Sequence, residues 1–327
     1  MRTWPFIKSG VCLVLALSAI GFIVPSVYAQ DYPNRHINVI IASLPGTPSD
    51  ITGRLFSEEL GKILKTELIV NNKPGASMTL GTDQVVRSKK EGYTIGYTTT
   101  SGVVYARVSN PETVPYDPVK DLEPLGLSVF MPASVNVLAS SPWKSFSDLV
   151  DYAKKNPEKL RISTHGQGSV DHLNVEVIQS LTGARFTYVP FKGTQLVTAL
   201  LGGHVEVTVD AASNIIPHVH SGKLRMLLLT KKMAEFPDVP VITDLGYKQN
   251  LFMSWFAFIA PAGLPENVKK VLVPALEKAI KNPDLKTKIG KMGLIVDYRS
   301  PAELKELMID NYDKACVVAK KLGLRKD

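Results

Sequence analysis

Short apolar runs alternate with amphipathic helical patterns along most of the chain. In the first third, three apolar runs and two helical patterns follow one another, at residues 36–43, 49–64, 67–72, 79–90 and 93–99. In the first helical pattern, apolar positions from Ile51 to Ile63 recur close to one face, as a period of 3.6 residues requires. Near-continuous apolar strands joined by helices are typical of parallel sheets that helices cover on both faces.

The pattern changes at residues 114–145. This stretch is rich in proline and holds two extended runs with no helical pattern between them, which we interpret as a crossing into a second domain. The alternation then resumes, at residues 145–158, 160–165, 169–183, 185–191, 193–203, 205–210, 214–223 and 224–230. An apolar run at residues 252–265 is predicted to return the chain to the first domain. Two long helical patterns, at residues 265–293 and 300–323, surround a last strand at residues 294–299.

This order predicts an α/β fold of two domains, each a mostly parallel sheet flanked by helices, joined by two crossing segments. The expected first domain consists of residues 30–128 and 252–327, and the expected second domain of residues 129–251. A domain inserted in this way is the plan of a hinged receptor that closes around a ligand. Open parallel sheets place their binding loops beyond the carboxyl ends of the strands, where we expect the ligand.

Length and composition fit such a receptor. The chain has 327 residues, of which 45% are hydrophobic and 21% charged, enough for about two domains of ordinary size. Residues 1–29 are predicted to be a secretory signal peptide, because Arg2 and Lys8 precede an apolar stretch and small residues end at Ala29, the expected cleavage point. The apolar stretch of about 14 residues is shorter than a membrane-spanning helix, so we expect an exported, soluble, periplasmic protein.

Charge and cysteine content exclude several kinds of site. The formal net charge is +8, and removal of Arg2 and Lys8 leaves about +6, which favours anionic small molecules. The lysines are spread along helical patterns without interleaved aromatic residues, so we expect no nucleic-acid binding. Cys12 lies in the predicted signal peptide, which leaves Cys316 alone and allows no disulfide or multi-cysteine metal site in the mature chain. We interpret Cys316 as a buried structural thiol and expect no metal and no cofactor.

The loop "ASLPGTPSD", residues 42–50, joins the first predicted strand to the first predicted helix. Thr47 is placed to cap the helix, Pro48 suits its first position, and Asp50 stands three residues after the cap, as in a capping box. Backbone N–H groups and the positive end of the helix dipole would then face the cleft, where a carboxylate binds favourably. A well-capped helix that binds nothing explains the same residues equally well.

A second loop, "STHGQGS" at residues 163–169, again lies between a predicted strand and a predicted helix. Gly166 and Gly168 permit close approach of the backbone to a ligand, and Thr164 and Ser169 add hydroxyl groups. The lysine of a Walker loop is absent, so this is not a nucleotide phosphate site. Two such loops on different domains would grip the two ends of one small anion.

Three more segments stand at predicted strand ends, at residues 98–102, 189–195 and 209–214. Lys192 would supply positive charge to an acid, although a surface lysine is the commoner outcome. Asp210 would accept a hydrogen bond from a ligand hydroxyl or amine, or else cap the following helix.

Catalytic motifs are weak in this chain. There is no G-x-S-x-G elbow, and Ser169, Asp171 and His172 stand too close together to suggest a triad by themselves. We interpret His165 and His172 as hydrogen-bonding residues that line or support the cleft. Three further histidines lack nearby carboxylates or cysteines and are not expected to bind a metal: His204, His218 and His220.

Longer stretches carry a specific resemblance. They include, in order, "HINVIIASLPGTPSD", "NNKPGASMTLGTD", "YDPVKDLEPLGL", "STHGQGSVDHL", "VPFKGTQLVTALLGG" and "FAFIAPAGLP". Together they resemble the periplasmic solute receptors of tripartite tricarboxylate transporters, also called Bug-type receptors, from about Tyr32 to the last helix. The resemblance implies a flytrap-like, periplasmic-binding-protein fold without catalysis, which delivers a captured carboxylate to the permease subunits of a membrane transporter. We expect a monomer.

Receptors of this family hold a carboxylate through backbone amides, small hydroxyl side chains and ordered water. Carried onto this chain, the resemblance implies contacts from the two loops and from the further strand ends. The expected ligand-binding residues are Ser43, Gly46, Thr47, Ser49, Asp50, Thr100, Ser101, Thr164, Gly166, Gly168, Ser169, His172, Lys192, Gly193, Thr194, Asp210 and Ala211. One departure affects the first loop: the family has P-G-G-x-x-D, whereas Thr47 and Pro48 stand here after Gly46, and proline has no N–H to donate.

Two alternatives use the same cleft. A secreted hydrolase would employ a Ser/His pair near it, and a signalling receptor would present the bound ligand to a membrane sensor instead of a permease. The carbon skeleton of the ligand also stays open. Phe130, Tyr188, Phe191 and Trp255 would suit a cleft for an aromatic acid, although a hydrophobic core is the commoner place for each.

Overall fold

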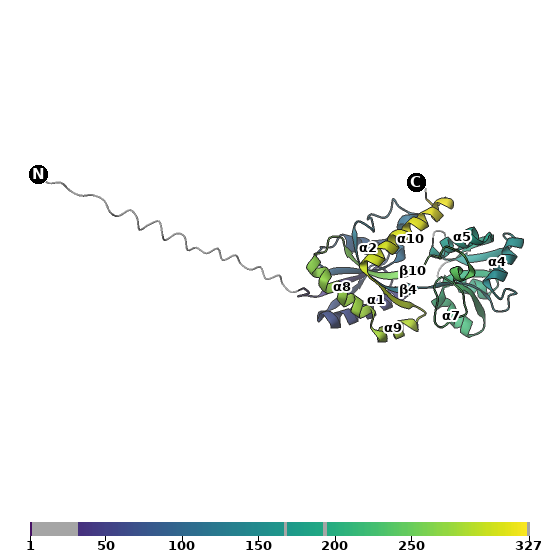
Figure 1. The fold of residues 1–327 in the computed structure, drawn as a ribbon, viewed down its shortest axis with the longest axis horizontal. Coiled ribbons are helices and arrows are strands. Elements are labelled where there is room, and N and C mark those ends of the chain that lie inside the picture. The colour runs from purple at the N-terminus through teal and green to yellow at the C-terminus, as the bar shows by residue number, and fades with distance from the viewer. Residues whose placement is uncertain (2–31, 167–168, 192–194, 326–327) are drawn as a thin grey trace. The chain divides into compact units, whose positions relative to one another are not determined.

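The computed structural model describes Met1 and residues 32–166, 169–191 and 195–325 (Figure 1). The predicted signal peptide lies outside the described residues, apart from Met1. The chain from Tyr32 onward forms one compact unit. Within the described ranges, no helix combines the length and the apolar character that a bilayer crossing requires.

The first sheet runs in the order β11-β4-β10-β3-β1-β2. Its strands are β1 (Ile37–Ile41), β2 (Leu68–Asn72), β3 (Thr94–Thr99), β4 (Leu122–Met131), β10 (Ser254–Pro261) and β11 (Ile295–Arg299). Strand β1 is parallel to β2 and β3, whereas β10 is antiparallel to β3 and β4, and β11 is antiparallel to β4. Val39 and Ile40 belong to different core clusters, because successive side chains point to opposite faces of a sheet.

The second sheet runs in the order β7-β6-β8-β5-β9. Its strands are β5 (Ala133–Leu138), β6 (Leu160–Thr164), β7 (Phe186–Pro190), β8 (Val207–Ala211) and β9 (Leu224–Leu229). Strand β6 is parallel to β7 and β8, and β5 is antiparallel to β8 and β9.

Both sheets are therefore mixed, which corrects the expectation of mostly parallel sheets. The cause is the route of the chain between them. Strand β4 passes directly into β5 through Pro132, and residues 230–253 lead back from β9 to β10. The outgoing and returning strands are neighbours in each sheet, β4 with β10 and β5 with β9, so they run in opposite directions. The expected domain limits, 30–128 with 252–327 and 129–251, stay a prediction.

Helices flank both sheets (Figure 1). Those of the first sheet are α1 (Pro48–Leu64), η1 (Ala76–Met78), α2 (Thr79–Val86), η2 (Ser101–Tyr105), α3 (Ala106–Ser109), α8 (Glu266–Ile280), α9 (Pro283–Gly290) and α10 (Pro301–Lys321). Those of the second sheet are α4 (Phe146–Lys155), α5 (Val170–Thr182), α6 (Gln195–Leu201), α7 (Ala212–His220) and η3 (Ile242–Leu245). The single helical pattern expected at residues 265–293 is divided into α8 and α9, because the Asn282 side chain caps α9 and Pro283 takes its first position.

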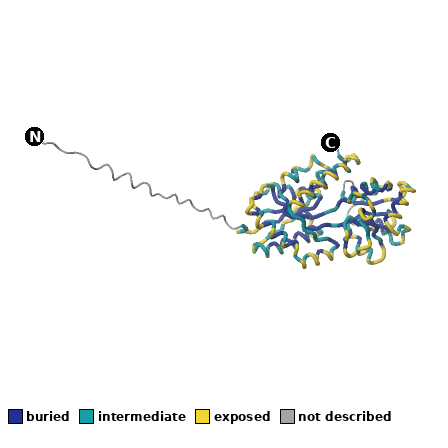
Figure 2. Tube along the Cα trace, viewed as in Figure 1, coloured by how far each residue is buried: buried dark blue, intermediate teal, exposed yellow. Residues whose placement is uncertain are grey.

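Burial follows the strands (Figure 2). One core cluster joins β1, α1 and α8, with Val39, Phe56 and Leu272 among its buried residues. Another cluster is continuous from Leu127 of β4 in the first sheet to Val135 of β5 in the second sheet. This core spans both sheets, and the candidate site lies at the ends of β3, β6 and β8.

Candidate functional site

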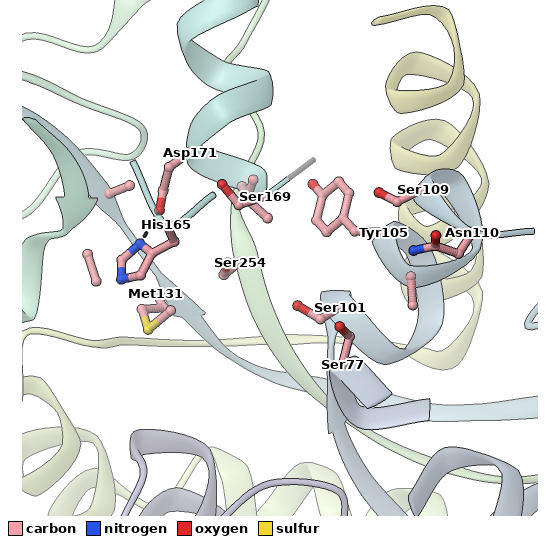
Figure 3. Close-up of a pocket in the computed structure, with 14 residues that line it drawn as sticks. Ser77, Ser101, Tyr105, Ser109, Asn110, Met131, His165, Ser169, Asp171 and Ser254 are labelled. Carbon is pink, nitrogen blue, oxygen red and sulfur yellow. Dashed lines mark hydrogen bonds and ion pairs between the residues drawn. The ribbon is translucent and has the colours of Figure 1, made fainter. Parts of the chain in front are cut away.

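A cavity of about 430 Å³ lies between the parts of the chain built on the two sheets (Figure 3). The part around the first sheet contributes Ser77, Ser101, Tyr105, Ala106, Ser109, Asn110, Met131 and Ser254. The part around the second sheet contributes Ala133, His165, Ser169, Val170, Asp171 and Ala211. No lysine or arginine belongs to this lining in the described part of the chain, so positive potential comes from His165 and from backbone N–H groups.

One wall of the cavity is a helical segment that begins where β3 ends. Ser101, Tyr105 and Ser109 recur every four residues, so they lie on one face of this segment, and all three line the cavity. The Tyr116 hydroxyl donates a hydrogen bond to the Gly102 carbonyl oxygen and holds the segment from behind. The hydroxyl of Tyr105 is buried and has no hydrogen-bond partner among the described residues. This wall therefore offers hydroxyl groups to a polar ligand.

The opposite wall is the start of α5. Ser169 is the N-cap, and its hydroxyl accepts a hydrogen bond from the backbone N–H of His172 at 3.2 Å. The first N–H groups of a helix, here those of Val170 and Asp171, have no acceptor within the helix. Together with the helix dipole they favour a negatively charged group at this end of the cavity.

His165 lies between two carboxylates beside this helix start. Its Nδ1 is 2.8 Å from Asp171 Oδ2, and its Nε2 is 3.7 Å from Asp210 Oδ1. Asp210 is fully buried; its Oδ1 accepts hydrogen bonds from the Ala211 N–H at 2.7 Å and from Asn214 Nδ2 at 3.0 Å. Its Oδ2 has no hydrogen-bond partner among the described residues. The imidazole thus stands between the cavity and a buried acid.

The protonation of this group follows from its surroundings. The hydrogen bond that His165 donates to Asp171, aided by the charges of Asp171 and Asp210, raises the pKa of His165 against the opposing effect of burial. Burial raises the pKa of Asp210 to about 6, although the His165 charge pulls it down. Since the pKa of His165 is raised in balance, His165 stays an imidazolium beside the cavity more readily than an isolated histidine would.

His172 supports this wall from behind and does not line the cavity. Its ring centroid is 4.5 Å from that of Tyr188, and its Nε2 is 3.9 Å from Glu176 Oε1. Burial lowers the pKa of His172, so its ring is predominantly neutral at neutral pH. The Ser169 hydroxyl bonds the backbone of His172 and not its imidazole, which is not the geometry of an activated nucleophile.

The first loop has the predicted cap. Thr47 is the N-cap of α1, Pro48 takes the first position, and the Thr47 hydroxyl accepts from the Asp50 N–H at 3.4 Å. The return bond differs from a capping box, because Asp50 Oδ2 accepts from the Gly46 N–H at 2.9 Å and not from the Thr47 N–H. Hydrogen bonds from Asn72 and Gly46 outweigh the effect of burial and lower the pKa of Asp50.

The hydroxyl groups of the same loop bond to one another. Ser49 Oγ donates to Ser43 Oγ at 2.7 Å, and Thr47 Oγ1 donates to Ser43 Oγ at 3.1 Å. None of these residues lines the cavity described above. Gly46 and Gly166 both have positive φ, +79° and +111°, and a Cβ at either would meet no atom within 4 Å, so backbone there is open to an approaching group.

The cavity brings together part of the predicted ligand-binding set. Ser101, Ser169 and Ala211 line it. Thr100 is buried beneath, where its hydroxyl accepts from the Trp255 N–H at 2.8 Å, and Thr164 donates to the Tyr188 hydroxyl at 3.4 Å. The predicted residues outside the cavity lining are Ser43, Gly46, Thr47, Ser49, Asp50, Thr100, Thr164, Gly166, His172 and Asp210. Gly168, Lys192, Gly193 and Thr194 lie outside the described residues.

Several lining residues escaped the sequence-based prediction. Tyr105 and Ser109 follow from the four-residue spacing that begins at Ser101, a signal that the neighbouring β-branched residues obscured, and Asn110 comes directly after Ser109. Ser77 has no comparable signal, because its position depends on an unusual backbone conformation.

The aromatic candidates do not gather at this cavity. Phe130 and Trp255 are buried in the core, with 4% and 1% of their surface exposed, and Tyr188 packs on His172. Among the described residues, no group of three or more histidine, cysteine or acidic side chains is arranged to hold a metal ion.

Comparison with known proteins gives the wider context. The family model described as the tripartite tricarboxylate transporter family receptor matches residues 52–324. A solved TctC solute-binding protein from Polaromonas is 26% identical, with a TM-score of 0.80, over 89% of this chain and 99% of its own.

Two similar structures hold named acids. An R. palustris protein with adipate is 25% identical, with a TM-score of 0.73, over 90% of this chain and 99% of its own. MatC of Rhodopseudomonas palustris, with bound malate, is 26% identical, with a TM-score of 0.68, over 88% of this chain and 99% of its own.

Proposed function

Because this chain belongs to the receptor family of tripartite tricarboxylate transporters, we propose that it captures a small organic carboxylate and delivers it to a membrane permease of that type. The family consists of periplasmic solute-binding receptors and not of enzymes, and the chain has their two-domain α/β fold, with two mixed sheets flanked by helices. The hydrolase alternative is therefore set aside.

The start of α5 carries the proposal for the ligand. Its Ser169 hydroxyl and its first N–H groups, which have no acceptor within the helix, adjoin a cavity whose described lining has no lysine or arginine. Helix N-termini of this kind bind carboxylates through backbone donors, without a paired cation. Adipate and malate in two relatives are acids of suitable size for about 430 Å³.

Closure would complete the site. We place the hinge in the two connections between the expected domains, residues 30–128 with 252–327 and residues 129–251. Rotation about them would bring the open backbone at Gly46 and Gly166 onto opposite sides of the ligand. Since Pro48 removes one donor from the first loop, the Thr47 hydroxyl would take a larger share of the contacts there.

The remaining parts of the proposal concern the cell. They are export to the periplasm with cleavage after Ala29, a monomeric receptor, and docking on integral permease subunits. The docking fits a family whose name is that of a membrane transporter.

The test compares two serine helix caps, one that lines the cavity and one that does not. Ser169→Gly keeps most of the capping free energy, since glycine is a tolerated N-cap, but removes the hydroxyl. We expect it to weaken binding of the best acid in a carboxylate panel by about tenfold, the loss of one hydrogen bond to a charged group. Melting-temperature shifts at several ligand concentrations, which follow RT ln(1 + [L]/Kd), measure the change.

Ser145→Gly is the matched control. Ser145 caps α4 around the same sheet, its hydroxyl accepts from the Asp148 N–H at 3.1 Å, and it does not line the cavity. Equal affinity losses in the two variants would refute a contact at Ser169. A panel in which sugars or cationic amines stabilise the protein and no carboxylate does would refute the proposed function itself.

A further inference from the structure

A turn of unusual backbone conformation borders the cavity. Ala76, Ser77 and Met78 have φ angles of +45°, +53° and +74°, in the left-handed region that side chains with a Cβ avoid. Residues held in such conformations persist only where the surrounding structure fixes them, and they concentrate at ligand sites. Three consecutive left-handed residues beside a cavity therefore indicate a functional role for this turn.

Hydrogen bonds hold this turn in place. The Met78 N–H donates to the Gly75 carbonyl oxygen at 2.9 Å, and the Thr82 hydroxyl donates to the Met78 carbonyl oxygen at 2.9 Å. Thr99, the last residue of β3, donates its hydroxyl to Met78 Sδ at 2.8 Å. The same Thr99 Oγ1 accepts from the Ser101 N–H at 3.2 Å. One side chain thus ties the turn to the start of the helical wall.

The result is a pair of hydroxyl groups on one wall. Ser77 and Ser101 lie next to each other in Figure 3 and both line the cavity. Neither hydroxyl makes a side-chain hydrogen bond to the described part of the chain, so both remain available to a ligand. The start of α5, with Ser169, lies across the cavity from them.

Serine at position 77 is not required by the backbone. At Gly75, φ is +131°, a backbone conformation that residues with a Cβ rarely adopt, so glycine is favoured there. A glycine at position 77 would adopt the same left-handed conformation without the steric cost that the Cβ of serine brings. The feature that serine adds is its hydroxyl, and that hydroxyl faces the cavity.

We propose that Ser77 is a specificity-determining residue which, with Ser101, hydrogen-bonds an oxygen-bearing group at the end of the ligand remote from α5. The inference rests on the proposed capture of a carboxylate. It narrows the ligand to an acid with a second hydroxyl or carboxylate group, because a hydrocarbon or aromatic end would leave both serine hydroxyls without a partner in a closed site.

The experiment compares acids of equal length with one or two polar ends. Linear mono- and dicarboxylates of three to eight carbons and malate are screened by thermal shift, and the best diacid and its monoacid counterpart, such as adipate and hexanoate, are measured by calorimetry. We expect Ser77→Ala to weaken binding of the diacid by about tenfold and to leave binding of the monoacid nearly unchanged. The selectivity ratio, which is the affinity for the diacid divided by that for the monoacid, therefore falls by about tenfold.

Two further variants separate the hydroxyl from the backbone. Ser77→Gly removes the hydroxyl and relieves the left-handed conformation, so it should match the affinity of Ser77→Ala while melting about 2 °C higher. Ala76→Gly relieves the adjacent left-handed residue, which does not line the cavity, and should keep wild-type affinity and selectivity.

The outcomes are distinguishable. If the wild type binds acids and Ser77→Ala keeps the selectivity ratio, the role of Ser77 is refuted while the proposed function stands. An Ala76→Gly variant that loses as much selectivity as Ser77→Ala also refutes it, since backbone conformation would then be the cause. If the wild type binds no acid in the series, the proposed function fails and the role of Ser77 fails with it.

Discussion

His165 connects the cavity to a buried acid, and this position decides how binding depends on pH. As an imidazolium it balances Asp171 at 2.8 Å and the more distant Asp210. As a neutral ring it would leave carboxylates beside an incoming anion, which repel it. The hydrogen bond that His165 donates to Asp171 raises the pKa of His165 above its ordinary value of 6.5, so the imidazolium loses its charge above that pH.

Affinity for a carboxylate is therefore expected to fall as pH rises from 6.5 through the pKa that His165 has in the folded protein. His165→Gln keeps a hydrogen-bond donor but has no titrating charge, so it should bind several-fold more weakly at pH 6 and show a flatter profile between pH 6 and 8. Calorimetry with one acid across this range measures both slopes.

His220→Gln provides the comparison. His220 is an exposed histidine whose Nε2 lies 3.0 Å from Glu235, and it does not line the cavity. A wild-type slope retained in His165→Gln, or lost in His220→Gln, would contradict the role given to His165.

The helical segment after β3 shows how packing overrides a local sequence preference. Residues 98–104 contain Thr and Val at most positions, a composition that favours strand, yet the chain turns into η2 and α3 immediately after Thr99. Gly102 makes this possible, because a Cβ there would lie 2.7 Å from Thr98 Oγ1 and 2.8 Å from Thr82 Oγ1. The close approach sets the position of Ser101 and Tyr105.

Gly102→Ala is expected to destabilise the protein by about 1–3 kcal/mol, as overpacking does, and to weaken ligand binding by moving the wall. Gly290→Ala is the control, since a Cβ at that helical position meets nothing within 4 Å and should be neutral or slightly stabilising. Chemical denaturation measures the free energy of unfolding of both variants. Equal stability of the two variants would show that the segment does not depend on this contact.

Helix caps and apolar periodicity were readable from the sequence, whereas contacts made between distant segments were not. Thr47 and Pro48 have local signatures, and the structure confirms the cap they predict. The left-handed turn at Ser77 has none, because Thr99, more than twenty residues away along the chain, holds Met78 in place. The division of the helical pattern at Asn282 was readable in principle, since Asn-Pro is a cap followed by a favoured first residue.

The two-domain α/β architecture also followed from the sequence, because the change of pattern at residues 114–145 marks the passage from one sheet to the other. The mixed strand directions did not, since strand order depends on which strands become neighbours after the chain returns. Of the predicted site residues, Ser101, Ser169 and Ala211 line the cavity, and each lies at or directly before the first residue of a helical segment.

Helix α5, which is proposed to bind the ligand, also contacts a connection between the two sheets. Asn174 of α5 is fully buried, and its side chain donates to the Phe252 carbonyl oxygen at 3.0 Å and accepts from the Phe252 N–H at 2.7 Å. Phe252 belongs to the connection that returns the chain to the first sheet. Helix α5, whose start is proposed to bind the carboxylate, is therefore hydrogen-bonded to one of the two connections. A receptor of this kind closes about such connections.

The most direct test of carboxylate capture is mass spectrometry of the receptor purified under native conditions, with the bound solute released by denaturation and identified. We expect one small organic acid per chain, with a second oxygen-bearing group in addition to its carboxylate. A sugar or a cationic amine in its place, bound at one per chain, would contradict it.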